Sequence, residues 1–175
     1  MGRAEEIDPP SQWLSRWVEL IPKSGPVLDV ACGGGRNTRL LVQQGFLVEA
    51  IDRDLSAVQD LRGNPQVQLT CADLEANAWP YTGRTFAGVV VVNYLHRALF
   101  PELLAALAPD AIFLYETFAA GNEKYGKPSN PNFLLQPGEL LEAVRGRARV
   151  IAYEDLYVER PKPAMVQRIC ARRAR

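Results

Sequence analysis

Short hydrophobic runs alternate with longer amphipathic stretches along most of this chain. Five runs are rich in Val, Ile, Leu and Phe and are bounded by turn residues, which is typical of buried strands. These predicted strands are residues 27–30, 46–51, 67–71, 86–92 and 111–115. Some of the segments between them carry apolar residues at helical spacing, and the others have the composition of loops. Strands that alternate with helices predict a mostly parallel, doubly wound α/β sheet.

The remaining segments extend this pattern at both ends. A helical face over residues 10–21 is stopped by Pro22 and Gly25, and Trp13 and Trp17 lie on it, most simply as core residues. Further predicted helices cover residues 37–44, 55–61, 101–107 and 136–144, and two more strands cover residues 149–158 and 164–171.

The composition limits the class of protein. The 175 residues are enough for one domain, which we expect to span residues 1–175 with a loose start over residues 1–9. Lys plus Arg and Asp plus Glu both number 20, which gives no support for a long-range field toward nucleic acid. Cys32, Cys71 and Cys170 are far apart and fit reduced thiols in a cytoplasmic protein. No run is long enough to cross a membrane, and the N-terminus lacks a signal-peptide pattern.

The stretch after the first predicted strand carries the strongest chemical signal. Gly33, Gly34 and Gly35 remove the side chains from one turn, so that a ligand can approach its backbone closely. Asp29 precedes the turn. The dinucleotide fingerprint Gly-x-Gly-x-x-Gly is incomplete, because Thr38 stands where its third glycine belongs. A carboxylate beside the turn favours a ligand with a positive centre over a pyrophosphate.

This stretch resembles motif I of the class I S-adenosylmethionine (SAM) methyltransferases. In that family an acid precedes a Gly-x-Gly-x-Gly turn and helps to hold the amino acid end of the cofactor. Here Ala31 replaces the first glycine, while Gly33 and Gly35 match. The chain looks most like the small tellurite-resistance-type branch, which implies SAM as cofactor, S-adenosylhomocysteine (SAH) as product and a small, soft acceptor. The resemblance also implies a Rossmann-like seven-stranded sheet with an antiparallel C-terminal strand.

Two later acids follow strands and extend the predicted site. Asp52 lies about 20 residues after the glycine turn, at the spacing of an acid that binds a ribose. It can also be read as a helix cap, and we assign the ribose to Asp52 and the cap to Asp54. The resemblance places Asp73 on the adenine amine. It implies cofactor contacts from Asp29, Ala31, Cys32, Gly33, Gly35, Arg36, Asn37, Asp52, Arg53, Asp73, Leu74, Asn93 and Leu95.

The acceptor side is less defined. The polar segment 119–137 begins near the carboxyl ends of the predicted strands, where the binding cleft is expected. It is interpreted as an acceptor-side lid or, alternatively, as a surface insert. His96 is the single histidine and a possible general base, although a structural or cofactor-contacting role is at least as common for such a residue. Glu116 can orient an acceptor. Tyr94, Tyr115 and Tyr125 are possible aromatic walls for a sulfonium.

Three functions remain open at this point. The first is methyl transfer to a small molecule by in-line displacement, by a monomer or a homodimer. The second is an RNA or protein methyltransferase, since the basic C-terminal stretch 168–175, with Arg168, Arg172, Arg173 and Arg175, can touch phosphates, although the neutral net charge disfavours nucleic acid. The third is a SAM-binding protein that has lost transfer. The acceptor itself does not follow from the sequence.

Overall fold

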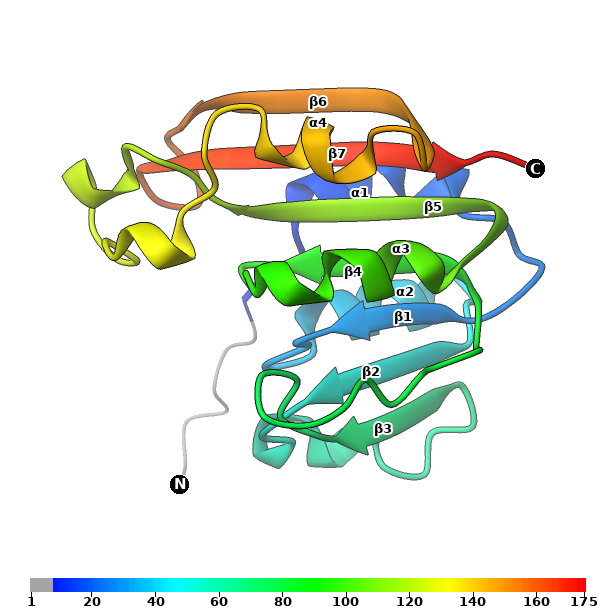
Figure 1. Ribbon diagram of the computed structural model, residues 1–175. Helices are drawn as coiled ribbons and strands as arrows, with labels where there is room; N and C mark the ends of the chain where they lie inside the picture. The colour runs from blue at the N-terminus through cyan, green and yellow to red at the C-terminus, as the bar shows by residue number, and fades with distance from the viewer. Residues whose placement is uncertain (1–7) are drawn as a thin grey trace, which may run out of the picture.

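The computed structural model describes residues 8–175, and within them seven strands form one sheet in the order β3-β2-β1-β4-β5-β7-β6 (Figure 1). The strands are β1 Val27–Val30, β2 Val48–Asp52, β3 Val67–Cys71, β4 Phe86–Val92, β5 Leu107–Phe118, β6 Ala148–Val158 and β7 Ala164–Arg173. Strands β3, β2, β1, β4 and β5 are parallel to one another, and β7 is antiparallel to both β5 and β6. The predicted fold class is therefore confirmed.

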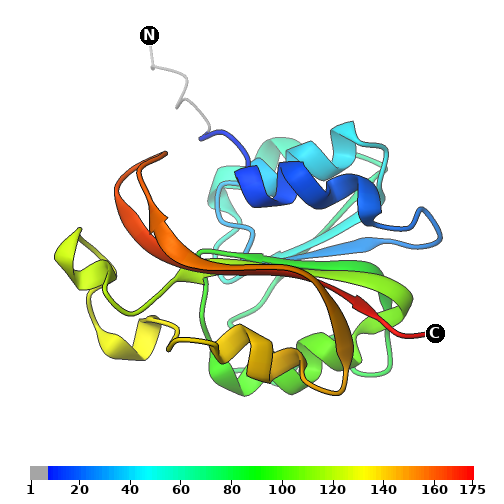
Figure 2. The same ribbon diagram turned by 90° about the horizontal axis from the view of Figure 1, so that it is seen from above.

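Helices cover both faces of this sheet, as Figure 2 shows. Helix α1 (Gln12–Trp17), which continues as the 3-10 turn η1 (Val18–Leu20), lies on one face with α2 (Arg36–Gln43). On the other face lie α3 (Phe100–Ala105) and α4 (Glu139–Val144). Shorter 3-10 turns are η2 Ser56–Leu61, η3 Arg97–Leu99, η4 Asn122–Lys124 and η5 Pro131–Phe133. The segment predicted as a helix over residues 55–61 is thus a 3-10 helix.

The alternation of side chains along the central strands explains both layers. Val90 and Leu114 belong to the cluster that also holds Trp13 and Leu41, from α1 and α2. Val89 belongs to the cluster under α3 and α4, as does its register partner Phe113. Because β4 is buried on both faces, its continuous β-branched run is what a central strand requires.

The start of β5 differs from the prediction. The helix predicted over residues 101–107 ends at Ala105, and β5 begins at Leu107. Leu107 pairs with Phe86, and the register then shifts, so that Ile112 pairs with Gly88. The residues between contain Pro109 and Asp110, and Asp110 has a φ of 64°. Pro109 and Asp110 therefore mark an irregularity inside the strand.

The segment 119–137 is tied to the sheet. Ala119 forms a parallel bridge with Leu135. The buried Asn122 donates from Nδ2 to the Pro128 carbonyl oxygen at 2.9 Å and accepts from the Met165 backbone N–H at 3.1 Å. The segment lies on the α4 side of the sheet, away from residues 8–12 (Figure 2).

Two other expectations concern the whole chain. None of the three cysteines forms a disulfide, as predicted. Among residues 8–175, no helix has both the length and the apolar character needed to cross a membrane. The loose start predicted over residues 1–9 falls mostly on residues 1–7, which lie outside the described part of the chain.

Candidate active site

The glycine turn links β1 to α2 through left-handed backbone. Ala31, Gly33 and Gly35 have φ values of 54°, 52° and 75°. The Gly35 N–H donates to the Cys32 carbonyl oxygen at 2.8 Å, which closes the turn. A Cβ on Gly35 would lie 2.7 Å from Val58 Cγ1, whereas a Cβ on Gly33 would meet nothing within 4 Å. Gly35 therefore packs on the protein, and Gly33 is open to a ligand.

A cavity of about 690 Å³ lies over this turn at the carboxyl ends of β1, β2 and β4. We call it the glycine-turn cavity. The lining residues predicted as cofactor contacts are Ala31, Cys32, Gly33, Arg36, Asn37, Asp52, Arg53 and Asn93. Gly34, Arg39, Ala57, Asp60, Val92 and Tyr94 also line it, together with Asp8. The structure thus brings most of the predicted cofactor residues around one hollow.

Asp52 connects the turn to β2. Its Oδ2 accepts from the Gly33 backbone N–H at 2.8 Å, and its Oδ1 accepts from the Asp54 N–H at 3.0 Å. Asp54 in turn accepts from the N–H of Ser56, the first residue of η2, at 2.8 Å. The N-cap of η2 is however Leu55, without a side-chain cap, so Asp54 closes a turn just before this helix and is not the cap that the sequence predicted. Asp52 stays at the edge of the cavity, where each carboxylate oxygen can accept further hydrogen bonds.

Asp29 does not line the cavity. Its side chain is only 1% exposed, and Thr38 Oγ1 donates to its Oδ2 at 2.6 Å. Burial raises the pKa of this carboxyl from 3.8 to about 7, although the hydrogen bond from Thr38 works in the opposite direction. Asp29 thus holds Thr38, in the first turn of α2, from beneath the glycine turn.

Replacement of Asp29 by Asn is expected to change how stability depends on pH. Folded Asp29 keeps its proton up to about pH 7, whereas the unfolded carboxyl loses it near 3.8. In this window the folded state binds more protons, so wild-type stability should fall as pH rises, by at most roughly 4 kcal/mol. Asp29→Asn lacks this term and should gain relative to wild type from pH 4 to pH 7. Urea unfolding at a series of pH values measures the difference, and a difference that does not vary with pH contradicts the expectation.

Besides Asp29 and Gly35, three predicted cofactor residues lie outside the lining of the glycine-turn cavity. The Asp73 carboxylate accepts from the Glu75 N–H at 2.9 Å and so closes its own turn. Leu74 and Leu95 are buried in the core cluster beneath α3 and α4. None of the three lines the cavity, so their cofactor contacts stay predictions.

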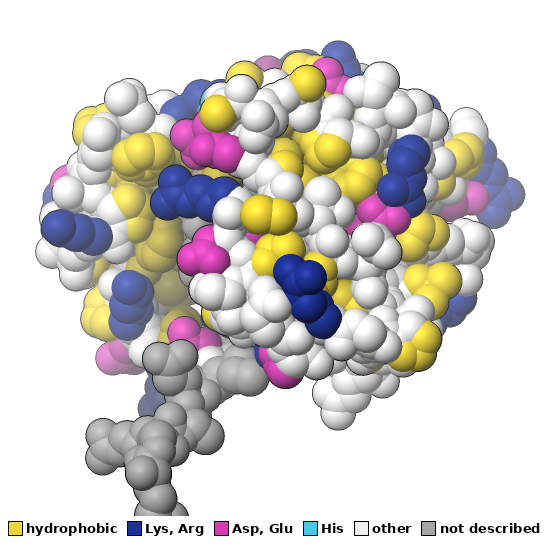
Figure 3. Space-filling model, turned by 90° about the horizontal axis from the view of Figure 1, so that it is seen from below, with side chains coloured by type: hydrophobic (Ala, Val, Ile, Leu, Met, Phe, Trp, Pro, Cys, Tyr) yellow, Lys and Arg dark blue, Asp and Glu magenta, His cyan; other side chains and the backbone are white. Residues whose placement is uncertain are grey.

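A second cavity, of about 420 Å³, adjoins the first. We call it the hairpin cavity, because the turn between β6 and β7 forms one wall through Arg160, Pro161 and Lys162. The opposite wall is residues 8–12, which lead into α1 and include its first residue, and the floor includes Glu116 and Phe118 from β5. Figure 3 shows a hollow on this side of the molecule, with hydrophobic side chains inside and Lys or Arg side chains at its margins. Asp8, Arg36 and Asn93 line both cavities.

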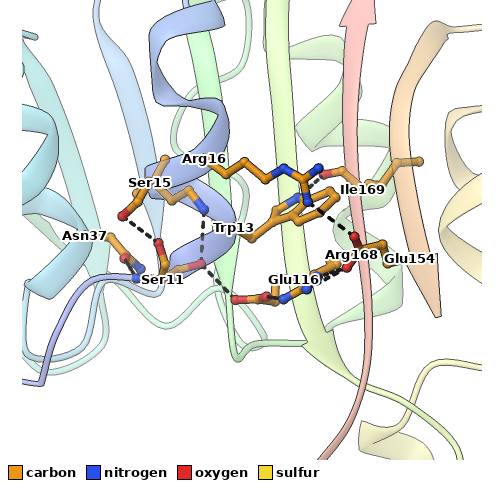
Figure 4. Close-up of polar contacts among 10 residues, drawn as sticks. Ser11, Trp13, Ser15, Arg16, Asn37, Glu116, Glu154, Arg168 and Ile169 are labelled. Carbon is orange, nitrogen blue, oxygen red and sulfur yellow. Dashed lines mark hydrogen bonds and ion pairs between the residues drawn. The ribbon is translucent and has the colours of Figure 1, made fainter. Parts of the chain in front are cut away.

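A polar network fixes the floor of the hairpin cavity (Figure 4). Ser11 Oγ donates to Glu116 Oε1 at 2.8 Å, and Arg168 Nη1 donates to Glu116 Oε2 at 3.1 Å. Arg168 Nε also donates to Glu154 Oε2 at 2.7 Å. The Arg168 guanidinium lies 4.9 Å from the ring centre of Trp13, which is buried as predicted. Ser11 and Arg168 thus meet at Glu116, and Arg168 links this group to Glu154 on β6.

The other predicted acceptor residues lie elsewhere. His96 lines neither cavity. Tyr94 lines the glycine-turn cavity, Tyr115 is buried and donates to the Tyr94 carbonyl oxygen at 2.7 Å, and Tyr125 packs on Tyr157. No residue of 119–137 lines the hairpin cavity, so the lid predicted there does not cover it.

Residues 8–12 and the β6–β7 turn form the walls that sequence reasoning missed. The two segments are far apart in the chain, and neither carries a chemical motif. The one available signal was Arg160 and Lys162 close together in the predicted hairpin.

Comparison with known proteins supports the same fold. Residues 27–110 match the family model of a methyltransferase domain. No curated protein matches the sequence. The glycopeptide N-methyltransferase MtfA, solved with sinefungin, aligns with a TM-score of 0.65 at 20% identity, over 95% of this chain and 94% of that chain.

Two further solved structures have the same fold. TehB from Haemophilus influenzae aligns with a TM-score of 0.71 at 16% identity, over 91% of this chain and 60% of that chain. The 1,6-didemethyltoxoflavin-N1-methyltransferase of Burkholderia thailandensis, solved with 1,6-didemethyltoxoflavin and S-adenosylhomocysteine, aligns with a TM-score of 0.63 at 19% identity, over 93% and 75% of the two chains. The chain thus has the Rossmann-like methyltransferase fold.

Proposed function

We propose that this chain is a SAM-dependent methyltransferase that acts on a small-molecule acceptor. The observation that carries the proposal is the pair of adjoining cavities at the carboxyl edge of a methyltransferase-fold sheet, with Arg36 and Asn93 lining both. A transfer between two molecules needs two sites that meet, because alignment of donor and acceptor supplies much of the rate enhancement. The match of residues 27–110 to a methyltransferase domain supports the same proposal.

The glycine-turn cavity suits SAM as the donor. The open backbone at Gly33 allows close approach, and Asp52 has free acceptor capacity for ribose hydroxyls. The Arg36 guanidinium suits the donor's carboxylate, while its Nη1 also donates to the Pro9 carbonyl oxygen at 3.0 Å. Asp29 acts from below as a positioning residue, through Thr38. MtfA is also solved with SAH, the product that SAM would leave.

The hairpin cavity is the acceptor site of this proposal. SAM supplies an activated methyl group with a good leaving group, so the protein mainly holds the acceptor in line. Glu116 is the proposed orienting group, because Ser11 and Arg168 fix its carboxylate at the floor. His96 has no part in this proposal, since it lines neither cavity. The likeness to TehB supports the tellurite-resistance-type branch, but the acceptor is argued from the cavity.

The basic C-terminus gives little support to an RNA acceptor. Arg175 Nε pairs with Asp110 Oδ2 at 2.8 Å, and Arg173 donates to the Leu107 carbonyl oxygen. These arginines lie at the end of the sheet opposite to the strand carboxyl ends (Figure 1). The volume of the hairpin cavity, about 420 Å³, suits a small molecule.

Calorimetry with SAM and SAH tests the donor site. Both are expected to bind, and Asp52→Ala should weaken SAH binding by roughly one to two orders of magnitude, because charge-assisted hydrogen bonds are lost. Asp54→Asn is the matched control, since Asp54 lies nearby but lines neither cavity. If neither ligand binds wild type, the proposed function is wrong. If Asp52→Ala and Asp54→Asn behave alike, the ribose contact lies elsewhere.

A further inference from the structure

The hairpin cavity carries an excess of positive charge. Four basic side chains line it, Arg36, Arg160, Lys162 and Arg168, against the two acidic side chains of Asp8 and Glu116. The whole chain has no net charge, so this excess is local. A cavity lined mainly by one sign of charge attracts ligands of the opposite sign.

Two of the four cations already have partners. Arg168 lies between the carboxylates of Glu116 and Glu154, with side-chain exposures of 18%, 14% and 25%. Such a group is balanced and holds the floor together. Arg36 donates to Pro9 and faces both cavities, which fits the proposed donor role.

Arg160 and Lys162 differ from these two. Within residues 8–175, neither forms an ion pair or a hydrogen bond through its side chain. Lys162 Nζ lies 5.9 Å from the ring centre of Phe118, which also lines the cavity. Both lie on the turn that faces residues 8–12 across the cavity. Their charges are available to a ligand.

The surface beside these cations is apolar. Phe118, Val158 and Val166 line the same cavity, next to Pro161. Val166 is buried, and Phe118 is partly buried. An apolar body can lie on this wall while an anionic group reaches Arg160 and Lys162. Arg is well suited to bidentate contacts with carboxylate or phosphate, and Lys adds a point charge.

We infer that the acceptor is a small organic anion, with a carboxylate or phosphate group held by Arg160 and Lys162 and an apolar body against Phe118, Val158 and Val166. This inference rests on the proposed function, because it takes the hairpin cavity as the acceptor site. It places the nucleophilic atom at the other end of the acceptor, toward Asn93, where the two cavities meet.

Binding of model anions tests the inference without knowledge of the acceptor. The probes are cinnamate, phenyl phosphate and the neutral methyl cinnamate, measured by ligand-observed NMR with the protein saturated by SAH. The double variant Arg160→Gln/Lys162→Gln removes both charges. Lys124→Gln is the matched control, because it removes a charge from an exposed lysine that lines neither cavity.

At least one anion is expected to bind wild type more tightly than methyl cinnamate. The double variant should bind that anion at least about tenfold more weakly, since charge-assisted contacts are lost. Lys124→Gln should bind it as wild type does, and all variants should keep their SAH affinity. The tighter anion identifies the head group. Equal binding of the ester, or equal loss in both variants, would overturn the inference. Lack of SAH binding to wild type would instead refute the proposed function.

Discussion

The Gly35→Val variant is expected to lose about 2–6 kcal/mol of unfolding free energy. Gly35 has a φ of 75°, which is costly for a β-branched residue, and its Cβ would lie 2.7 Å from Val58 Cγ1. Val58 is fully buried beneath the turn, so it has little room to move. The variant should also lose SAH binding, because the turn that Gly35 closes lines the glycine-turn cavity. Urea unfolding and calorimetry measure the two effects.

Gly45→Val is the control for this substitution. Gly45 follows α2 with a φ of 82°, but a Cβ there would meet nothing within 4 Å. It should therefore carry only the backbone strain, about 1–3 kcal/mol, and should leave SAH binding unchanged. If Gly35→Val and Gly45→Val lose the same free energy of unfolding, the close contact between the introduced side chain and Val58 does not contribute to the loss.

Trp13→Ala is expected to cost about 3–5 kcal/mol. Trp13 is 2% exposed, and its Nε1 donates to the Ile169 carbonyl oxygen at 3.0 Å (Figure 4). Loss of the ring leaves that oxygen without the indole donor and removes the surface under the Arg168 guanidinium. Trp13 lies in α1, and Ser11, the N-cap of that helix, also contacts Glu116 in the hairpin cavity. We therefore expect Trp13→Ala to weaken the binding of organic anions in the hairpin cavity as well. Urea unfolding and ligand-observed NMR provide the measurements.

The neighbouring Trp17 provides a matched comparison. Its Nε1 is buried but has no hydrogen-bond partner within residues 8–175. Trp17→Phe should therefore cost less than Trp13→Phe, by about 1 kcal/mol for the hydrogen bond that Trp13 alone makes. Equal losses in the two phenylalanine variants would contradict a role for the bond to Ile169.

The sequence predicted the strands best where local signals were complete. The bounds of β1, β3 and β4 agree with the prediction residue by residue, because each run is apolar or alternating and ends at turn residues. The prediction for β2 began two residues early, at Phe46. The exposed Leu47 precedes the first paired residue, Val48, and hydrophobicity alone does not distinguish it.

The candidate site was only half predictable. The glycine turn and Asp52 lie within one β-α-β unit, so their spacing in the chain fixes their proximity in space. The hairpin cavity instead depends on Ser11, Glu116 and Arg168, which come from three distant segments. Such an assembly follows from strand order, and no short motif encodes it. Gly88 in β4 packs closely against Ile21, since a Cβ there would lie 3.0 Å from Ile21 Cγ2, and this contact too depends on the fold.

The position of β7 determines when each cavity can form during synthesis on the ribosome. β7 is the last strand in the chain, yet it lies between β5 and β6. The strands around the glycine turn, β1, β2 and β4, leave the ribosome first and can pair with one another. The turn between β6 and β7, which forms one wall of the hairpin cavity, and Arg168 are synthesised only with residues 158–168. The residues that line the glycine-turn cavity, up to Tyr94, are therefore synthesised before Arg160, Lys162 and Arg168 complete the lining of the hairpin cavity.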